Sequence, residues 1–193
     1  MQIERALSEH GAPTLAGLKT ANLFPVKTEG EDVTLSLRRV NRILNGKGMR
    51  AIPLKRKKDS ILLYLFRPEK LREDLRQPET ACILEEKGYP GNKMDKCISC
   101  LIRHLKEDES FPHEIGLFLG YPPSDVKSFM ACSREGVKCT GCWKAYSNRE
   151  EAEKIFEKYR KCTRVYRREM RKGRSLERLA VDTAGRKTAP GCR

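Results

Sequence analysis

Residues 61–66, with the sequence ILLYLF, constrain the fold more than any other part of the chain because every position is apolar. A strand with apolar side chains on both faces has to be covered on both faces, so this segment predicts the central strand of a sheet. Residues 49–55 predict a second strand, joined to the first by a basic turn. Residues 22–26 predict a third strand, which Pro25 places at an edge or an interruption. A small sheet with a central hairpin follows from these segments.

Several helices are predicted from capping residues and from the spacing of apolar side chains. Thr28 and Glu31 have the spacing of a capping box, which predicts a helix start at that point. Asp95 and Asn148 are predicted to cap two later helices, the second running to about residue 172. The remaining predicted elements are helices at residues 2–9 and 69–87, a short strand at 141–146 and a closing element at 175–181.

Residues 110–126 predict a tight corner between two helices. Ser110 is a suitable cap for the first helix, and Gly120 suits the left-handed position that ends it. Pro122 and Pro123 then open the second helix. Together with the predicted strands, these elements indicate an α+β (mixed α/β) fold with a small mixed sheet packed by several helices. We expect one domain over residues 1–181 and a flexible basic tail at residues 182–193.

Composition narrows the classes of protein to which the chain can belong. No apolar run approaches the length of a membrane span, and charged residues follow the first methionine at once, so we expect a cytoplasmic protein with no membrane association. In that compartment the eight cysteines are expected to be reduced thiols or metal ligands rather than disulfides. The net charge of +14 also raises the possibility of a nucleic-acid partner.

Two polar helix starts supply the leading hypothesis for function. His10, Thr14 and Lys19 surround one predicted helix start, and His113 and Glu114 lie at another. Backbone N–H groups at a helix start bind anions, and histidine, lysine and glutamate permit acid–base chemistry. We therefore expect the segments 10–19 and 111–126 to form a cleft for a small anionic ligand. Binding, with or without turnover of the ligand, is the leading hypothesis.

The cysteines support an alternative hypothesis. Cys97 and Cys100 form one C-x-x-C pair, and Cys139 and Cys142 form another. Four thiolates in two pairs suit tetrahedral zinc or an iron–sulfur cluster. Cys97 also follows the predicted Asp95 cap, where a helix start favours a thiolate and hence redox chemistry. The long gap between the pairs disfavours a zinc ribbon, and burial of small apolar thiols is the simpler interpretation.

A nucleic-acid-binding protein is the third hypothesis. Positive charge concentrates at residues 154–178 and 55–58, and the corner at residues 110–126 has the pattern of a helix-turn-helix. The second helix of that corner, however, offers only Lys127 as a cation, while Asp125 would repel phosphate. A corner that packs on the sheet explains the same pattern.

Four segments together resemble an uncharacterised bacterial family. The segments are residues 10–19 (HGAPTLAGLK), 111–126, 143–146 (WKAY) and 161–163 (KCT). The family is the domain-of-unknown-function family numbered three-seven-nine-three. The resemblance covers nearly the whole chain to about residue 181 and implies a compact cytosolic protein, with no agreed activity or catalytic residues. Gly11 and Cys142 stand where a cysteine and an aromatic residue are expected, which weakens a shared metal or redox site.

Overall fold

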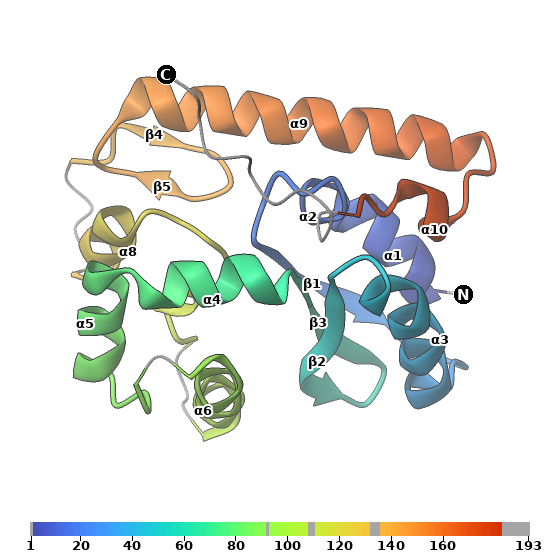
Figure 1. Cartoon of the computed structure of the whole chain (residues 1–193), viewed down its shortest axis with the longest axis horizontal. Helices are drawn as coiled ribbons and strands as arrows, with labels where there is room; N and C mark the ends of the chain where they lie inside the picture. The colour runs from blue at the N-terminus through green and yellow to red at the C-terminus, as the bar shows by residue number, and fades with distance from the viewer. Residues whose placement is uncertain (1, 92, 108–110, 132–135, 183–193) are drawn as a thin grey trace, which may run out of the picture.

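A computed structural model describes residues 2–91, 93–107, 111–131 and 136–182 of the chain. The predicted cap Ser110, residues 134–135 of the predicted loop and the tail from residue 183 lie outside these ranges. The described elements follow one another in this order (Figure 1): α1 Gln2–His10, α2 Ala12–Leu15, β1 Ala21–Lys27, α3 Val33–Asn45, β2 Arg50–Lys57, β3 Ser60–Phe66, α4 Pro68–Arg76, α5 Pro78–Glu86, α6 Met94–Glu107, α7 Ile115–Phe118, α8 Pro123–Met130, β4 Cys139–Thr140, β5 Lys144–Ala145, α9 Arg149–Arg171 and α10 Leu176–Leu179.

The main sheet has three strands in the order β1-β3-β2, so the apolar strand β3 lies at its centre as predicted. Both neighbours run antiparallel to β3, and the sheet is therefore antiparallel rather than mixed. Pro25 lies on β1, which is an edge strand of the sheet, as its missing N–H predicts. The α+β class predicted from the sequence is confirmed.

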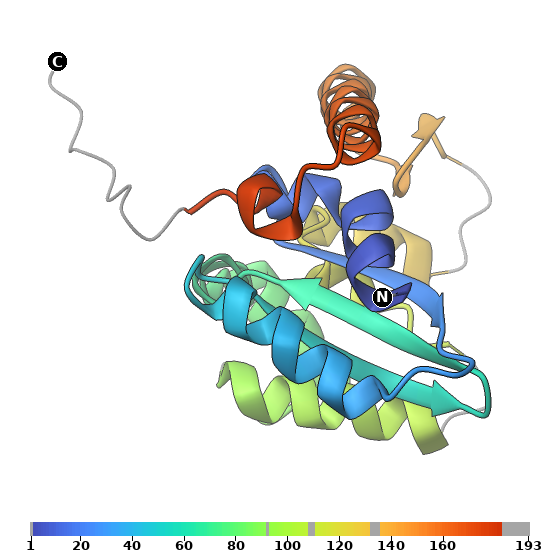
Figure 2. The same cartoon turned by 90° about the vertical axis from the view of Figure 1, so that its right-hand side faces the viewer.

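Helices cover both faces of this sheet (Figure 2). Leu63 and Leu65 of β3 pack with α1, α3 and α10 on one side. Tyr64 and Phe66, which alternate with them, pack with α4, α5, α6 and α7 on the other. Because successive side chains of a strand point to opposite faces, the apolar strand contributes to two separate cores.

The long helix α9 forms a further layer outside α1 and α2 (Figure 1). Asn148 caps it as predicted, with its side-chain oxygen accepting from the Glu151 N–H. On the face of α9 that turns to the protein, Ala152 and Phe156 are buried, whereas Tyr159, Cys162 and Tyr166 are half-buried. The second half of α9 therefore lies over the N-terminal segment, but the interface between them is only partly buried.

A buried arginine fixes the position of α2 beneath α9. The guanidinium of Arg67 donates to the carbonyl oxygens of Thr14, Leu15 and Val181 at 2.7 to 2.9 Å. Arg67 is only 1% exposed, and burial lowers the pKa of its guanidinium. One side chain thus ties the end of β3 to α2 and to Val181, two residues after α10, and so holds the segment leading to Lys19 in place.

Three local predictions are corrected by the structure. The capping box at Thr28 and Glu31 is wrong: α3 begins at Val33, and Asp32 is its cap, accepting from the Leu35 N–H at 3.0 Å. The Thr28 N–H instead donates to the Asp59 carbonyl and continues the sheet ladder, so the helix starts later.

The second correction concerns the predicted cap Asp95, which lies inside the first turn of α6 rather than ahead of it. The third concerns residues 141–146, which form a turn and β5 of a two-stranded hairpin rather than one strand. Gly141 lies against the ring of Phe156, where a β-carbon would clash, and this close approach sets the turn of the hairpin.

The corner between α7 and α8 has the geometry predicted for it. Gly120 adopts a φ of 72°, the left-handed conformation that glycine accommodates without strain. However, α7 is a single turn that is buried throughout, and α8 packs against α5 and β5. The first helix of the corner is thus part of the packed interior, whereas α8 is buried only at Asp125 and Val126. Among the described helices, none is long and apolar enough to cross a bilayer.

Candidate functional site

The structure distributes the five residues predicted to bind an anion over three places. His10 and Lys19 line a cleft of about 570 Å³ between the N-terminal segment and α9. His113 lines a second cavity, beneath the β4–β5 hairpin. Glu114 and Thr14 are buried and line neither. The segments 10–19 and 111–126 do meet, but through Lys19 and Tyr121 rather than through the two histidines.

The wall of the cleft opposite Lys19 is formed by arginines of α9. Arg160, Arg164, Arg167 and Arg171 follow one another at intervals of four, three and four residues, which places them on one face of the helix. Glu157 pairs with Arg160 at 2.9 Å and approaches Arg164 at 4.0 Å. Positive charge nevertheless remains in excess along the cleft. In the sequence these four residues belong to the basic stretch 154–178, and their spacing along the helix is the signal that identifies them.

Lys19 is the most unusual residue of the cleft because it is a buried cation. Its side chain is 6% exposed, and its Nζ donates to the Tyr121 hydroxyl at 3.4 Å. The same nitrogen lies 4.8 Å from the centre of the Tyr121 ring and 5.9 Å from that of Tyr159. Within the described part of the chain, no carboxylate forms an ion pair with it. Burial lowers the pKa of Lys19 to about 8, an effect that nearby Cys142 partly opposes.

Thr14 and His10 support this cleft in different ways. The Thr14 hydroxyl donates to the side-chain oxygen of Asn22 at 2.7 Å, and Asn22 in turn lines the cleft. Thr14 therefore positions a neighbour instead of reaching a ligand. The ring of His10 packs on Phe24, with 5.4 Å between ring centres, and remains at the edge of the cleft.

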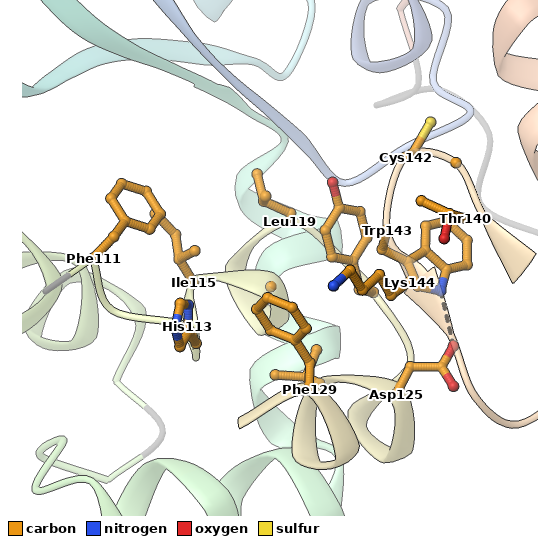
Figure 3. A pocket seen from close by; sticks show the side chains of 14 residues that line it. Phe111, His113, Ile115, Leu119, Asp125, Phe129, Thr140, Cys142, Trp143 and Lys144 are labelled. Carbon is orange, nitrogen blue, oxygen red and sulfur yellow. Dashed lines mark hydrogen bonds between the residues drawn. The ribbon is translucent and has the colours of Figure 1, made fainter. Parts of the chain in front are cut away.

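The second cavity, of about 430 Å³, lies between α7, α8 and the β4–β5 hairpin (Figure 3). Its wall is mainly apolar and aromatic. The His113 ring meets Phe129 edge-on at 4.9 Å, and the Lys144 Nζ lies 5.4 Å from the centre of the same ring. His113 and Lys144 thus both lie beside the ring of Phe129.

Asp125 attaches the hairpin to α8 at this cavity. Its carboxylate accepts from the Trp143 Nε1–H at 2.8 Å (Figure 3). It also accepts from the backbone N–H groups of Tyr146 and Ser147 at 2.9 Å. Burial acts to raise the pKa of Asp125, but these hydrogen bonds outweigh it and hold the pKa below its usual range. Asp125 was predicted to repel phosphate, and its carboxylate is instead engaged in hydrogen bonds within the protein.

Glu114 belongs to a polar network between α6 and α7. Its Oε1 accepts from the Tyr89 hydroxyl at 2.9 Å and lies 3.4 Å from the Nδ1 of His104. The other ring nitrogen of His104 lies 3.6 Å from the Cys100 sulfur. Glu114 is only 6% exposed and its carboxylate is engaged by these partners, so it is not available to a ligand held by Lys19.

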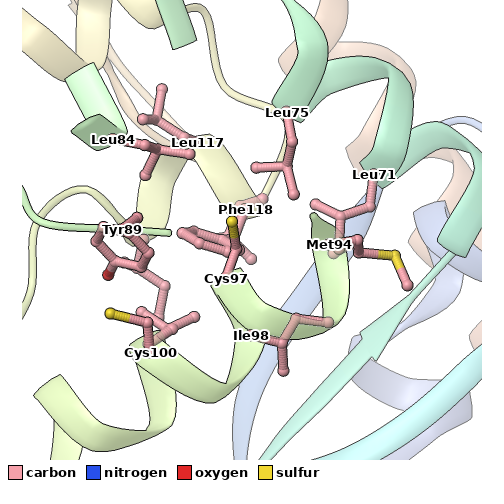
Figure 4. Close-up of a cluster of buried hydrophobic side chains, with 14 of the residues drawn as sticks. Leu71, Leu75, Leu84, Tyr89, Met94, Cys97, Ile98, Cys100, Leu117 and Phe118 are labelled. Carbon is pink, nitrogen blue, oxygen red and sulfur yellow. The ribbon is translucent and has the colours of Figure 1, made fainter. Parts of the chain in front are cut away.

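The two cysteine pairs occupy different structural environments. Cys97 and Cys100 lie on α6 within the buried apolar cluster (Figure 4), whereas Cys139 and Cys142 lie on the β4–β5 hairpin. Nowhere in the described ranges do three or more histidine, cysteine or acidic side chains gather in a group suited to a metal ion. Burial raises the pKa of Cys97, whose thiol donates to the Gly91 carbonyl at 3.0 Å. The thiolate predicted at this position is therefore disfavoured.

Comparison with known proteins gives the family but no activity. No curated protein and no solved structure matches the chain. The family model described as "Protein of unknown function (DUF3793)" matches residues 7–180, which confirms the family predicted from the sequence motifs. The chain therefore belongs to this family of proteins of unknown function.

Proposed function

We propose that the protein binds a small anionic ligand in the cleft between the N-terminal segment and α9. The observation that carries this proposal is the environment of Lys19, a buried ammonium group whose neighbours among the described residues are tyrosines and not carboxylates. A buried charge without an ionic partner is costly, so it is retained where an anion supplies the missing partner. In the leading hypothesis from the sequence the ligand was also an anion, with His113 and Glu114 as contacts. The arginines of α9 replace these two residues.

The arginines give the cleft its preference among anions. Guanidinium groups donate several hydrogen bonds in a fixed plane and match the oxygens of phosphate and carboxylate groups. Arg164 and Arg167 face the same cleft as Lys19, which suits a group with more than one negative charge. The cleft volume of about 570 Å³ suits a small molecule in preference to the backbone of a duplex.

Isothermal titration calorimetry with inorganic pyrophosphate at low ionic strength tests this proposal. We expect binding by the full chain, and a loss of about tenfold to a hundredfold in affinity for each of two variants, Lys19→Met and the double variant Arg164→Gln/Arg167→Gln. Arg168→Gln is the matched control, because Arg168 lies on the same helix but pairs with Glu169. Absence of binding, or an equal loss in the control, would refute the proposal.

The pH dependence of binding isolates the contribution of Lys19. Sulfate is the appropriate probe, because its charge does not change between neutral and moderately alkaline pH. Since the pKa of Lys19 is about 8, the affinity for sulfate should fall as the pH rises through that value. The fall should be absent in Lys19→Met. A profile that is the same in both proteins would assign the pH dependence to another group.

A further inference from the structure

The apolar cavity beneath the β4–β5 hairpin is not explained by the binding of a simple anion. Its volume is about 430 Å³, and Ile115, Leu119, Val126 and Phe129 contribute apolar surface to it. Its principal acid, Asp125, already accepts three hydrogen bonds from the hairpin. The cavity thus offers apolar contact with few unused hydrogen-bonding groups, which is the environment that an apolar part of a ligand requires.

The apolar cavity and the cationic cleft adjoin each other. Cys142 lines both, and its sulfur points away from the apolar side chains (Figure 3). Tyr121 makes a second connection, because it lines the apolar cavity while its hydroxyl accepts from the Lys19 Nζ in the cleft. Lys19 is therefore located where the two cavities meet.

The aromatic rings at this junction pack against one another. The Tyr121 ring stacks on Trp143 with 5.0 Å between centres and an angle of 29° between their planes. Trp143 in turn meets Phe156 edge-on. A ligand whose charged group contacts Lys19 would extend its remaining atoms along Tyr121 and Trp143. Flat apolar groups pack well on such rings.

We propose that the ligand is an organic phosphate whose apolar substituent, aromatic or aliphatic, occupies the cavity beneath the hairpin. This inference rests on the proposed function, because the phosphate occupies the cationic cleft. The number of cations in the cleft favours a phosphate monoester, which carries up to two charges, over a monocarboxylate. The apolar walls of the cavity then determine which phosphate monoesters bind most tightly, according to the substituent that each carries.

Calorimetry with the full chain tests separately whether the cleft binds phosphate and whether the apolar cavity binds the substituent. The probes are inorganic phosphate, phenyl phosphate and phenol. Burial of the phenyl group should make phenyl phosphate bind about tenfold to a hundredfold more tightly than inorganic phosphate. If inorganic phosphate binds and phenyl phosphate binds no more tightly, this inference is overturned and the proposed function stands. If neither phosphate binds, the proposed function itself fails.

A variant and a spectroscopic signal locate the substituent. Phe129→Ser removes part of the apolar wall at a half-buried position and should reduce the advantage of phenyl phosphate while leaving the affinity for inorganic phosphate unchanged. An equal loss for both probes would overturn the inference. Trp143 is the single tryptophan of the chain, so tryptophan fluorescence reports on this cavity. The measurement uses the wild-type protein and therefore does not depend on whether the Phe129 variant folds. Phenyl phosphate should change that emission more than inorganic phosphate does; equal changes would contradict the assignment.

Discussion

Replacing Lys19 by methionine should stabilise the folded protein while it removes anion binding. Methionine keeps an unbranched side chain in the buried position and eliminates the ammonium group. The folded protein bears the cost of desolvating this group, since no carboxylate among the described residues pairs with it. Substitution of a binding residue is expected to weaken ligand binding while it raises the free energy of unfolding. Substitution of a structural residue would lower the free energy of unfolding as well as weaken binding.

The magnitude follows from the pKa of Lys19. Burial lowers it from the ordinary value of 10.5 to about 8. A tenfold change in an acid constant is worth about 1.4 kcal/mol, so the charged form is disfavoured in the folded state by about 3 kcal/mol. Lys19→Met is therefore expected to raise the free energy of unfolding by up to about 3 kcal/mol at pH 7.

The advantage of the variant should depend on pH in a defined direction. Below about pH 8, Lys19 is charged in both the folded and the unfolded state, and the full cost applies. Between that pH and 10.5 the folded protein has released the proton while the unfolded chain retains it. The stability that Lys19 contributes then rises with pH, because the unfolded state binds more protons. The difference between variant and wild type should shrink over this interval.

Urea unfolding followed by circular dichroism at several pH values between about 7 and 10 measures this difference. Lys27→Met is the matched control, because Lys27 is exposed on the edge strand and its replacement should change the free energy of unfolding little at any pH. Two results would refute the reasoning. One is a variant less stable than wild type at pH 7, and the other is a stability difference that is the same across the pH range.

Three further substitutions or labelling experiments test other features of the structure. Arg67→Met should lower the free energy of unfolding by at least about 3 kcal/mol in urea titrations, because it removes three hydrogen bonds from a guanidinium to buried backbone carbonyls; a loss below about 1 kcal/mol would contradict this. Gly120→Ala should cost about 1 to 3 kcal/mol, because φ is positive and the β-carbon would meet Thr20. Gly30→Ala, with a similar φ but open space, should cost less, and equal melting temperatures would disprove the steric argument. Iodoacetamide followed by mass spectrometry should label exposed Cys142 in the native protein and buried Cys97 only after unfolding; early labelling of Cys97 would show that α6 is not packed as described.

Local sequence signals predicted the elements whose formation depends on near neighbours. Asn148 caps α9 because a cap and the N–H group that it receives lie three residues apart. Gly120 ends its turn because of its own backbone freedom. The capping box at Thr28 failed although it is equally local. The sheet uses the Thr28 N–H for a bond to Asp59, a partner 31 positions away along the chain.

Which residues form the candidate site depends on contacts between residues far apart in the sequence, more than the secondary structure does. His113 and Glu114 are adjacent in sequence, yet one faces the apolar cavity and the other enters a buried network with Tyr89. No spacing rule distinguishes these two outcomes, since the packing of α6 against α7 decides which side chain is covered. The arginines of α9 were visible as a basic stretch, but the surface that they face is contributed by the N-terminal segment.

The sequence by itself therefore determined the α+β class, the central strand β3, the limits of most helices and the family, because each depends on short-range patterning or on recognisable motifs. The tertiary structure alone decided that Lys19 is buried beside Tyr121 and opposite the arginines of α9. The cost of burying a charge depends on what distant segments pack around it. Residues 19 and 121 come together only when the whole chain has folded.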